Sequence, residues 1–103
     1  MVTLGIDYDV RPGQQEPFED LARQVLAVLD QVPGHRETRV YRDIFRLHSY
    51  LIRSEWASRE DLVSFTHSQR FREVQGMGTD LLLGPPRHEI YVRESEPLRP
   101  SEM

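Results

Sequence analysis

Histidine and tyrosine are the residue types in this chain best suited to acid–base chemistry. Cysteine is absent from the 103 residues, which excludes a thiolate nucleophile, thiolate metal ligands and disulfides. A histidine titrates near neutral pH and is the natural base for a substrate proton. His88 begins the last strand-like run and Tyr8 lies in the first one. We take His88 and Tyr8 as candidate catalytic residues, and the ordinary alternatives are a strand-end histidine and a core tyrosine.

The histidines and glycines do not form a metal or nucleotide site. Four histidines are far apart in the sequence, without the short spacing typical of metal ligands: His35, His48, His67 and His88. The segment Gly76-Met77-Gly78 lacks the third glycine and the following helix of a phosphate-binding loop. The sequence therefore predicts neither a metal site nor a nucleotide cofactor.

Aromatic and branched side chains provide the walls of a possible ligand pocket. Aromatic walls suit a flat, partly apolar substrate, and tyrosine and tryptophan add a polar group that orients it. The candidate pocket residues are Ile6, Tyr8, Ile52, Trp56, Phe65 and Phe71. The same residues are also what an ordinary core requires, so the sequence leaves both a pocket and a filled core open.

Hydrophobic periodicity defines the elements that would position these residues. Alternation from Val2 to Val10 predicts a strand, and a period near 3.6 from Phe18 to Val32 predicts a helix that Pro33-Gly34 ends. Runs over about 37–45 and 50–56, joined by a short loop at 47–49, predict an antiparallel hairpin.

Two short helices and a last strand complete the chain. Ser58 and Ser68 precede apolar stripes and are predicted to cap these helices. His88, Ile90 and Val92 alternate with polar residues in the last strand. The order predicts an α+β, ferredoxin-like βαββαβ fold, with a four-stranded antiparallel sheet and the helices on one face. Residues 1–93 form one domain, and 94–103 are predicted to be a flexible C-terminal tail.

Motifs around the third strand resemble the antibiotic-biosynthesis monooxygenase family. Members end that strand with tryptophan, cap the next helix with a serine followed by an acidic residue, and place Ser-x-x-Phe downstream. The matching residues are Trp56, Ser58, Glu60, Ser68 and Phe71. The resemblance covers residues 2–93 and implies a dimeric α+β barrel, in which two sheets face each other. It therefore favours a homodimer formed through the sheet faces over a monomer whose charged sheet face is exposed to solvent.

The resemblance also implies an activity. It predicts a cofactor-independent monooxygenase acting on a small aromatic, polyketide or quinol-like compound. In such chemistry the protein supplies a base, a donor that stabilises the substrate anion and a dry cavity. Many members have a histidine where this chain has Phe65, which supports the alternative of a non-catalytic dimeric protein that binds a small ligand or none.

The haem-degrading branch of the family matches poorly. Its strand asparagine, helical tryptophan and axial histidine correspond here to Ile6, Phe65 and Gln75. A glutamine is a poor iron ligand compared with imidazole. We therefore expect no haem degradation and no cofactor.

Charge and hydropathy restrict the remaining partners. The net charge is −4, and arginines are scattered among acidic residues, which argues against a nucleic-acid partner. No apolar run approaches the length of a membrane span, and the N-terminus lacks the pattern of a secretory signal. These features predict a cytoplasmic protein without a membrane partner.

Overall fold

The computed structural model describes the backbone of residues 1–92 and residue 101, and the side chains of 1–87 and 101. The elements follow one another as β1 (Val2–Asp9), α1 (Gln15–Leu29), β2 (His35–Arg42), β3 (Ser49–Trp56), α2 (Arg59–Thr66), α3 (Gln69–Gly76), the 3₁₀ turn η1 (Thr79–Leu81) and β4 (Arg87–Val92). This order confirms the predicted α+β fold. The predicted tail at 94–103 lies outside the described residues except for residue 101.

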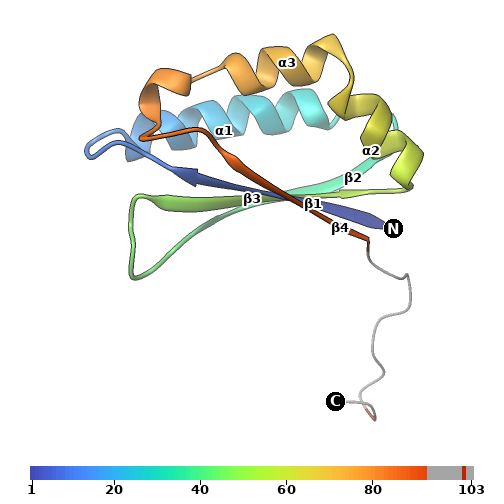
Figure 1. Cartoon of the computed structure of the whole chain (residues 1–103), viewed down its shortest axis with the longest axis horizontal. Helices are drawn as coiled ribbons and strands as arrows, with labels where there is room; N and C mark the ends of the chain where they lie inside the picture. The colour runs from blue at the N-terminus through green and yellow to red at the C-terminus, as the bar shows by residue number, and fades with distance from the viewer. Residues whose placement is uncertain (93–100, 102–103) are drawn as a thin grey trace.

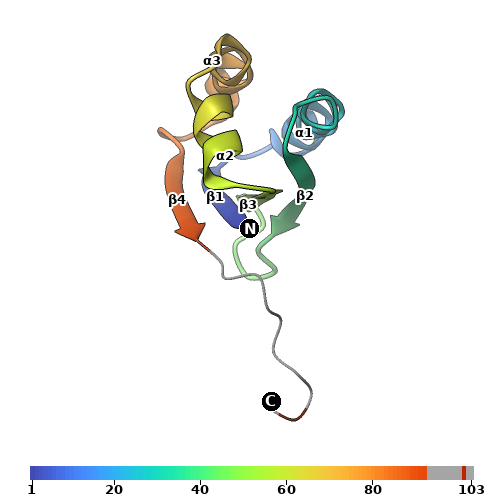
Figure 2. The same cartoon turned by 90° about the vertical axis from the view of Figure 1, so that its right-hand side faces the viewer.

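A single antiparallel sheet carries the helices on one face (Figures 1 and 2). The strand order is β2-β3-β1-β4. Ile6 in β1 is the register partner of Ile52 in β3 and of His88 in β4. This register places the alternating apolar residues of neighbouring strands on one face, because residues directly opposite each other point to the same side.

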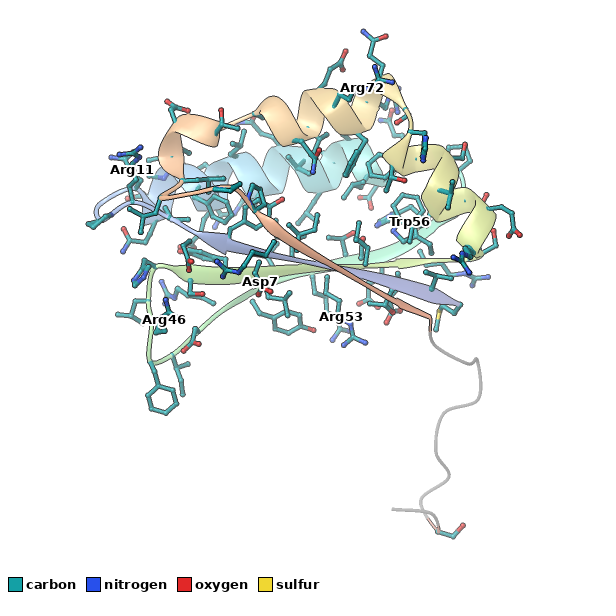
Figure 3. All side chains as sticks on the ribbon, viewed as in Figure 1. Asp7, Arg11, Arg46, Arg53, Trp56 and Arg72 are labelled. Carbon is teal, nitrogen blue, oxygen red and sulfur yellow. The ribbon has the colours of Figure 1, made fainter. Side chains whose placement is uncertain are left out.

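The helix-facing side of the sheet holds the hydrophobic core. Trp56 lies between the sheet and the helices, whereas Asp7 and Arg53 lie on the opposite face (Figure 3). We call that opposite face the open face. Its described side chains are Thr3, Asp7, Asp9, Glu37, Arg39, Tyr41, Ser49, Leu51, Arg53, Glu55 and Arg87.

Both predicted serine caps are confirmed. The Ser58 hydroxyl accepts a hydrogen bond from the amide of Asp61 at 3.1 Å, and the Ser68 hydroxyl accepts one from the amide of Phe71 at 3.2 Å. Each bond satisfies an amide that the first helical turn leaves without a partner.

Two predicted boundaries are wrong. The strand expected to reach residue 45 ends at Arg42, and the connection to β3 spans residues 43–48. The Asp43 carboxylate accepts bonds from the amides of Phe45 and Arg46, and this local turn takes the backbone out of the ladder. Helix α1 ends at Leu29, not Val32. The amides of Gln31 and Val32 donate to the carbonyls of Val28 and Leu29 in tighter turns, and Val32 itself precedes a proline, which disfavours the helical conformation there.

None of the helices in the described part of the chain has the length and apolar character needed to cross a membrane.

Candidate functional site

Tyr8 is the predicted catalytic residue whose side chain the structure describes. It is half-buried, and its ring lies 5.4 Å from the ring of Phe18 in α1. Among the described residues, none forms a hydrogen bond with its hydroxyl. Burial raises the pKa of Tyr8 to about 12, because a low-dielectric surrounding disfavours the phenolate. At neutral pH Tyr8 is therefore a hydrogen-bond donor and not a base.

Tyr8 and Ile52 line a narrow cavity between the sheet and helices α1 and α3. Its volume is about 40 Å³. The other lining residues are Phe18, Leu21, Ala22, Val25, Val74, Gln75, Met77, Gly78 and Leu82. A cavity that holds benzene measures about 150 Å³. The cavity therefore accommodates a water molecule or a diatomic gas. A ring compound can enter only if α1 or α3 moves away from the sheet.

The remaining predicted pocket residues form a neighbouring aromatic cluster. Trp56 is completely buried and donates a hydrogen bond from Nε1 to the Ser54 hydroxyl at 3.0 Å. Its ring stacks on Phe65 at 4.9 Å, and Phe71 meets Phe65 edge-on at 5.3 Å. Ile6 belongs to the same core cluster. The structure thus brings Tyr8 and Ile52 to one cavity and places the other four residues beside it.

His88 lies at a register position close to Tyr8. It pairs with Ile6 across β1 and β4, so it is the diagonal neighbour of Tyr8, at a typical Cα separation of about 7–8 Å. Its side chain lies outside the described residues, and its catalytic role stays a prediction. His67, which the helical spacing directs away from Phe65, is exposed.

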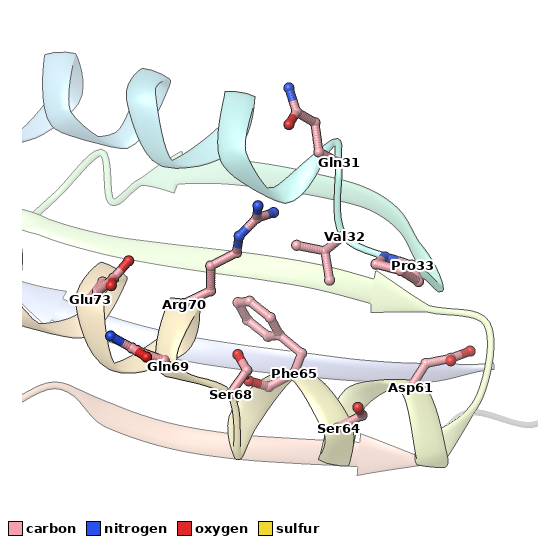
Figure 4. Close-up of a pocket in the computed structure, with 10 residues that line it drawn as sticks. All are labelled: Gln31, Val32, Pro33, Asp61, Ser64, Phe65, Ser68, Gln69, Arg70 and Glu73. Atoms are coloured by element: carbon pink, nitrogen blue, oxygen red, sulfur yellow. The ribbon is translucent and has the colours of Figure 1, made fainter.

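A second, open groove lies between the end of α1 and helices α2 and α3 (Figure 4). Its volume of about 730 Å³ is in the range of small-molecule sites. Phe65 and Val32 form its apolar part, and Arg70 and Glu73 lie on its α3 side. The sequence did not reveal this groove, because its residues come from three separate segments and follow no common period.

The cavity wall formed by α1 and α3 was also missed. The helical period between Phe18 and Val32 places Phe18, Leu21 and Val25 on one face of α1, but a periodic face does not show where packing leaves a gap. Gly78 lines the cavity with a φ of 72°, which disfavours a side chain there, and an added Cβ would clash with Leu21.

Possible metal ligands do not gather in the described residues. No group of three histidine or acidic side chains that could hold a metal ion is found among them.

A four-stranded antiparallel sheet with helices on one face, and an apolar cavity between them, defines a ferredoxin-like α+β protein. A sequence model of the family described as "Antibiotic biosynthesis monooxygenase" matches residues 1–77. The chain therefore belongs to this family, as its motifs indicated.

Solved structures of low sequence identity share the fold. The cofactor-independent oxygenase SnoaB from Streptomyces nogalater, in a mutant form, is 17% identical, with a TM-score of 0.80 over 92% of this chain and 94% of that one. A "putative antibiotic biosynthesis monooxygenase" from Bordetella bronchiseptica is 19% identical, with a TM-score of 0.80 over 91% of this chain and 97% of that one.

Two sequence relatives match most of this chain but only a small part of their own length. A "putative heme-binding protein" of Haloarcula marismortui is 34% identical over 86 residues, which is 84% of this chain and 13% of that protein. A protein of the same description from Haloquadratum walsbyi is 33% identical over 86 residues, 84% of this chain and 16% of the relative. This chain thus spans less than a fifth of the length of either relative.

Proposed function

We propose that this protein binds a small phenolic, quinol-like or anthrone-type compound between the sheet and helices α1 and α3 and oxygenates it without a cofactor. The observation that carries the proposal is the Tyr8 phenol, which borders an apolar cavity and has no hydrogen-bond partner among the described residues. Membership of the monooxygenase family and the shared fold with a cofactor-independent oxygenase support it.

In the proposed reaction, the substrate itself reduces O₂. A base removes a proton from the ring compound, the carbanion transfers one electron to O₂, and the two radicals join in a C–O bond. The resulting peroxide takes up a proton and loses water, which leaves a carbonyl group on the ring. Tyr8, neutral because its pKa is about 12, donates a hydrogen bond to the anionic ring oxygen. His88 is the proposed base, because imidazole titrates near neutral pH.

Substrate entry is proposed to require movement of α3. The cavity of about 40 Å³ excludes a ring compound. No residue of α3 is fully buried, and Phe71 and Val74 are half-buried. Separating α3 therefore exposes less apolar surface than separating α2, which buries Leu62 and Phe65. The open groove beside Phe65 lies between the same two helices, α1 and α3. It is the proposed entrance to the cavity for the substrate.

A second copy of the chain is proposed to cover the open face. Tyr41 and Leu51 give this face apolar surface. Arg39 pairs with Glu37, and Arg53 lies 3.9 Å from Glu55, so these charges are compensated before they are covered. Compensation matters because an unpaired buried charge is costly.

Oxygen uptake with a panel of anthrones, hydroquinones and phenols tests the proposed activity. We expect the wild-type protein to consume O₂ with at least one ring compound, and Tyr8→Phe to lower kcat by about a hundredfold, the usual loss for a donor to an oxyanion. Tyr41→Phe is the matched control, because Tyr41 lies on the open face, and its kcat is expected to stay at the wild-type value. Equal kcat values for Tyr8→Phe and Tyr41→Phe would contradict the role of Tyr8.

A non-catalytic ligand-binding protein is the second candidate. Phe65, which has no acid–base group, favours it. Binding of a ring compound, measured by quenching of Trp56 fluorescence without any O₂ uptake, would support this candidate over the monooxygenase.

Haem does not fit the observed cavity. Gln75 lines it instead of a histidine, and its volume is far below that of a cofactor site. The haem-binding description belongs to relatives of which this chain matches only 13 to 16% of the length. No haem-dependent step is therefore part of the proposed function.

A further inference from the structure

The loop between β2 and β3 presents apolar side chains to solvent. Phe45 is 90% exposed, Ile44 is 81% exposed and Leu47 is 55% exposed. Loops are normally polar where they project from a domain, because exposed apolar side chains gain nothing from water. We call the segment from Ile44 to Leu47 the loop tip.

Hydrogen bonds hold the loop tip in a defined shape. The Asp43 carboxylate accepts bonds from the amides of Phe45 at 2.7 Å and Arg46 at 3.0 Å. The amide of Ser49 donates to the carbonyl of Arg46 at 2.8 Å. These backbone bonds also lower the pKa of Asp43. The apolar side chains are thus held outward by a built turn, which reduces the entropy lost when a partner binds.

The loop extends beyond the sheet on the side of the open face. Figures 1 and 2 show it on the side of the sheet opposite the helices, and Figure 3 places Arg46 there. A second copy that covers the open face must therefore lie next to the loop tip.

The charges around the loop tip do not suit an anionic lipid surface. Arg42 lies 3.7 Å from Glu19, and Arg46 lies 4.0 Å from Asp9. Both guanidinium groups thus face carboxylates of their own chain, and the Asp43 carboxylate remains charged within the loop. Recruitment to anionic membranes depends on basic residues available to the lipid headgroups, so a protein surface is the favoured occupant.

We propose that the loop tip packs against a second copy of this chain at the edge of the sheet-to-sheet interface. The inference rests on the dimer of the proposed function and assigns it a further contact. In a twofold dimer each contact occurs twice, so two loop tips hold the two sheets together, with Phe45 and Ile44 buried on the partner.

Sedimentation equilibrium of three variants tests the loop contact. Ile44→Ser/Phe45→Ser removes most of the apolar surface of the tip, and we expect it to raise the dimer Kd at least about tenfold. Val63→Ser is the matched control, because Val63 is a 46% exposed residue of α2, and its Kd is expected to equal that of the wild type. Leu51→Asp places a charge on the open face and is expected to give monomers.

The outcomes separate the loop contact from the sheet dimer. If Leu51→Asp dissociates the dimer and the loop variant keeps the wild-type Kd, the loop inference is overturned and the sheet dimer stands. If only the loop variant dissociates, the proposed sheet interface is wrong. A wild-type protein that stays monomeric overturns both the loop contact and the sheet dimer. If the wild-type protein binds phosphatidylserine vesicles and the loop variant does not, the loop tip binds a membrane and the loop inference is overturned.

Discussion

Trp56 is the residue on which most of the aromatic core depends. It is completely buried, it stacks on Phe65, and its indole donates to Ser54. Trp56→Ala removes these contacts and leaves a cavity, so we expect it to lower the free energy of unfolding by about 3–5 kcal/mol. Urea unfolding at one fixed protein concentration measures the change. Trp56→Phe, which keeps an aromatic ring, should lose less, and an unchanged urea midpoint for Trp56→Ala would remove Trp56 from the core.

His35 makes stability depend on pH near neutrality. Its ring meets Trp56 edge-on at 5.3 Å, and its Nε2 lies 2.5 Å from the Thr38 hydroxyl. Burial lowers the pKa of His35 below its usual value, although Asp30 acts in the opposite direction. The unfolded chain, with a histidine pKa of about 6.5, therefore binds the proton more readily than the folded protein. The contribution of His35 is complete above that pH and falls as the pH drops toward the folded-state pKa.

The melting temperature measured between pH 5 and pH 8 tests this dependence. This pH range extends about one to two units on either side of the pKa of histidine in the unfolded chain. We expect His35→Gln to reduce the loss of stability at the acidic end. His67→Gln serves as the control, because the His67 side chain is exposed to solvent. Parallel pH curves for the wild type and His35→Gln would show that other groups cause the acid dependence.

The helices α2 and α3 differ in how firmly packing holds them. Helix α2 buries Leu62 and Phe65, whereas α3 buries no residue. Each begins with a serine cap, and the Ser68 hydroxyl also donates to the carbonyl of Phe65 at 2.6 Å. We therefore expect Ser58→Ala to lower global stability by about 1 kcal/mol and Ser68→Ala to act mainly on local opening of α3.

Amide hydrogen exchange distinguishes the two effects. Ser68→Ala should speed exchange in α3 alone, while Ser58→Ala should speed it throughout the chain. Uniform acceleration by Ser68→Ala would show that α3 opens only with the whole domain, and the proposed entry of substrate through α3 would then be contradicted.

The elements were predictable where one local signal sets them. Alternation around Ile6 and the serine caps at Ser58 and Ser68 have local causes, and the structure confirms both. Strand β2 ends early because the Asp43 carboxylate binds the amide of Phe45 and forms a turn. The apolar residues Ile44 and Phe45 continue the strand pattern in the sequence, so the pattern alone does not predict this turn. The cavity beside Tyr8 was less accessible to prediction, because its lining combines β1, β3, α1 and α3. Sequence periodicity identifies a buried face but not where two faces fail to fill the space between them.

At the scale of the whole molecule, stability and association should be linked. A chain of 103 residues buries only a modest core by itself. If a second copy covers the open face, folding and dimer formation are coupled, and the melting temperature rises with protein concentration by mass action. We expect a rise over about a hundredfold range of concentration for the wild type, and none for Leu51→Asp, which places a carboxylate in the interface. Calorimetry measures both. A wild-type melting temperature independent of protein concentration would mean that the stability is that of the monomer alone. The open face would then be exposed to solvent, and its Arg–Glu pairs would stabilise only the single chain.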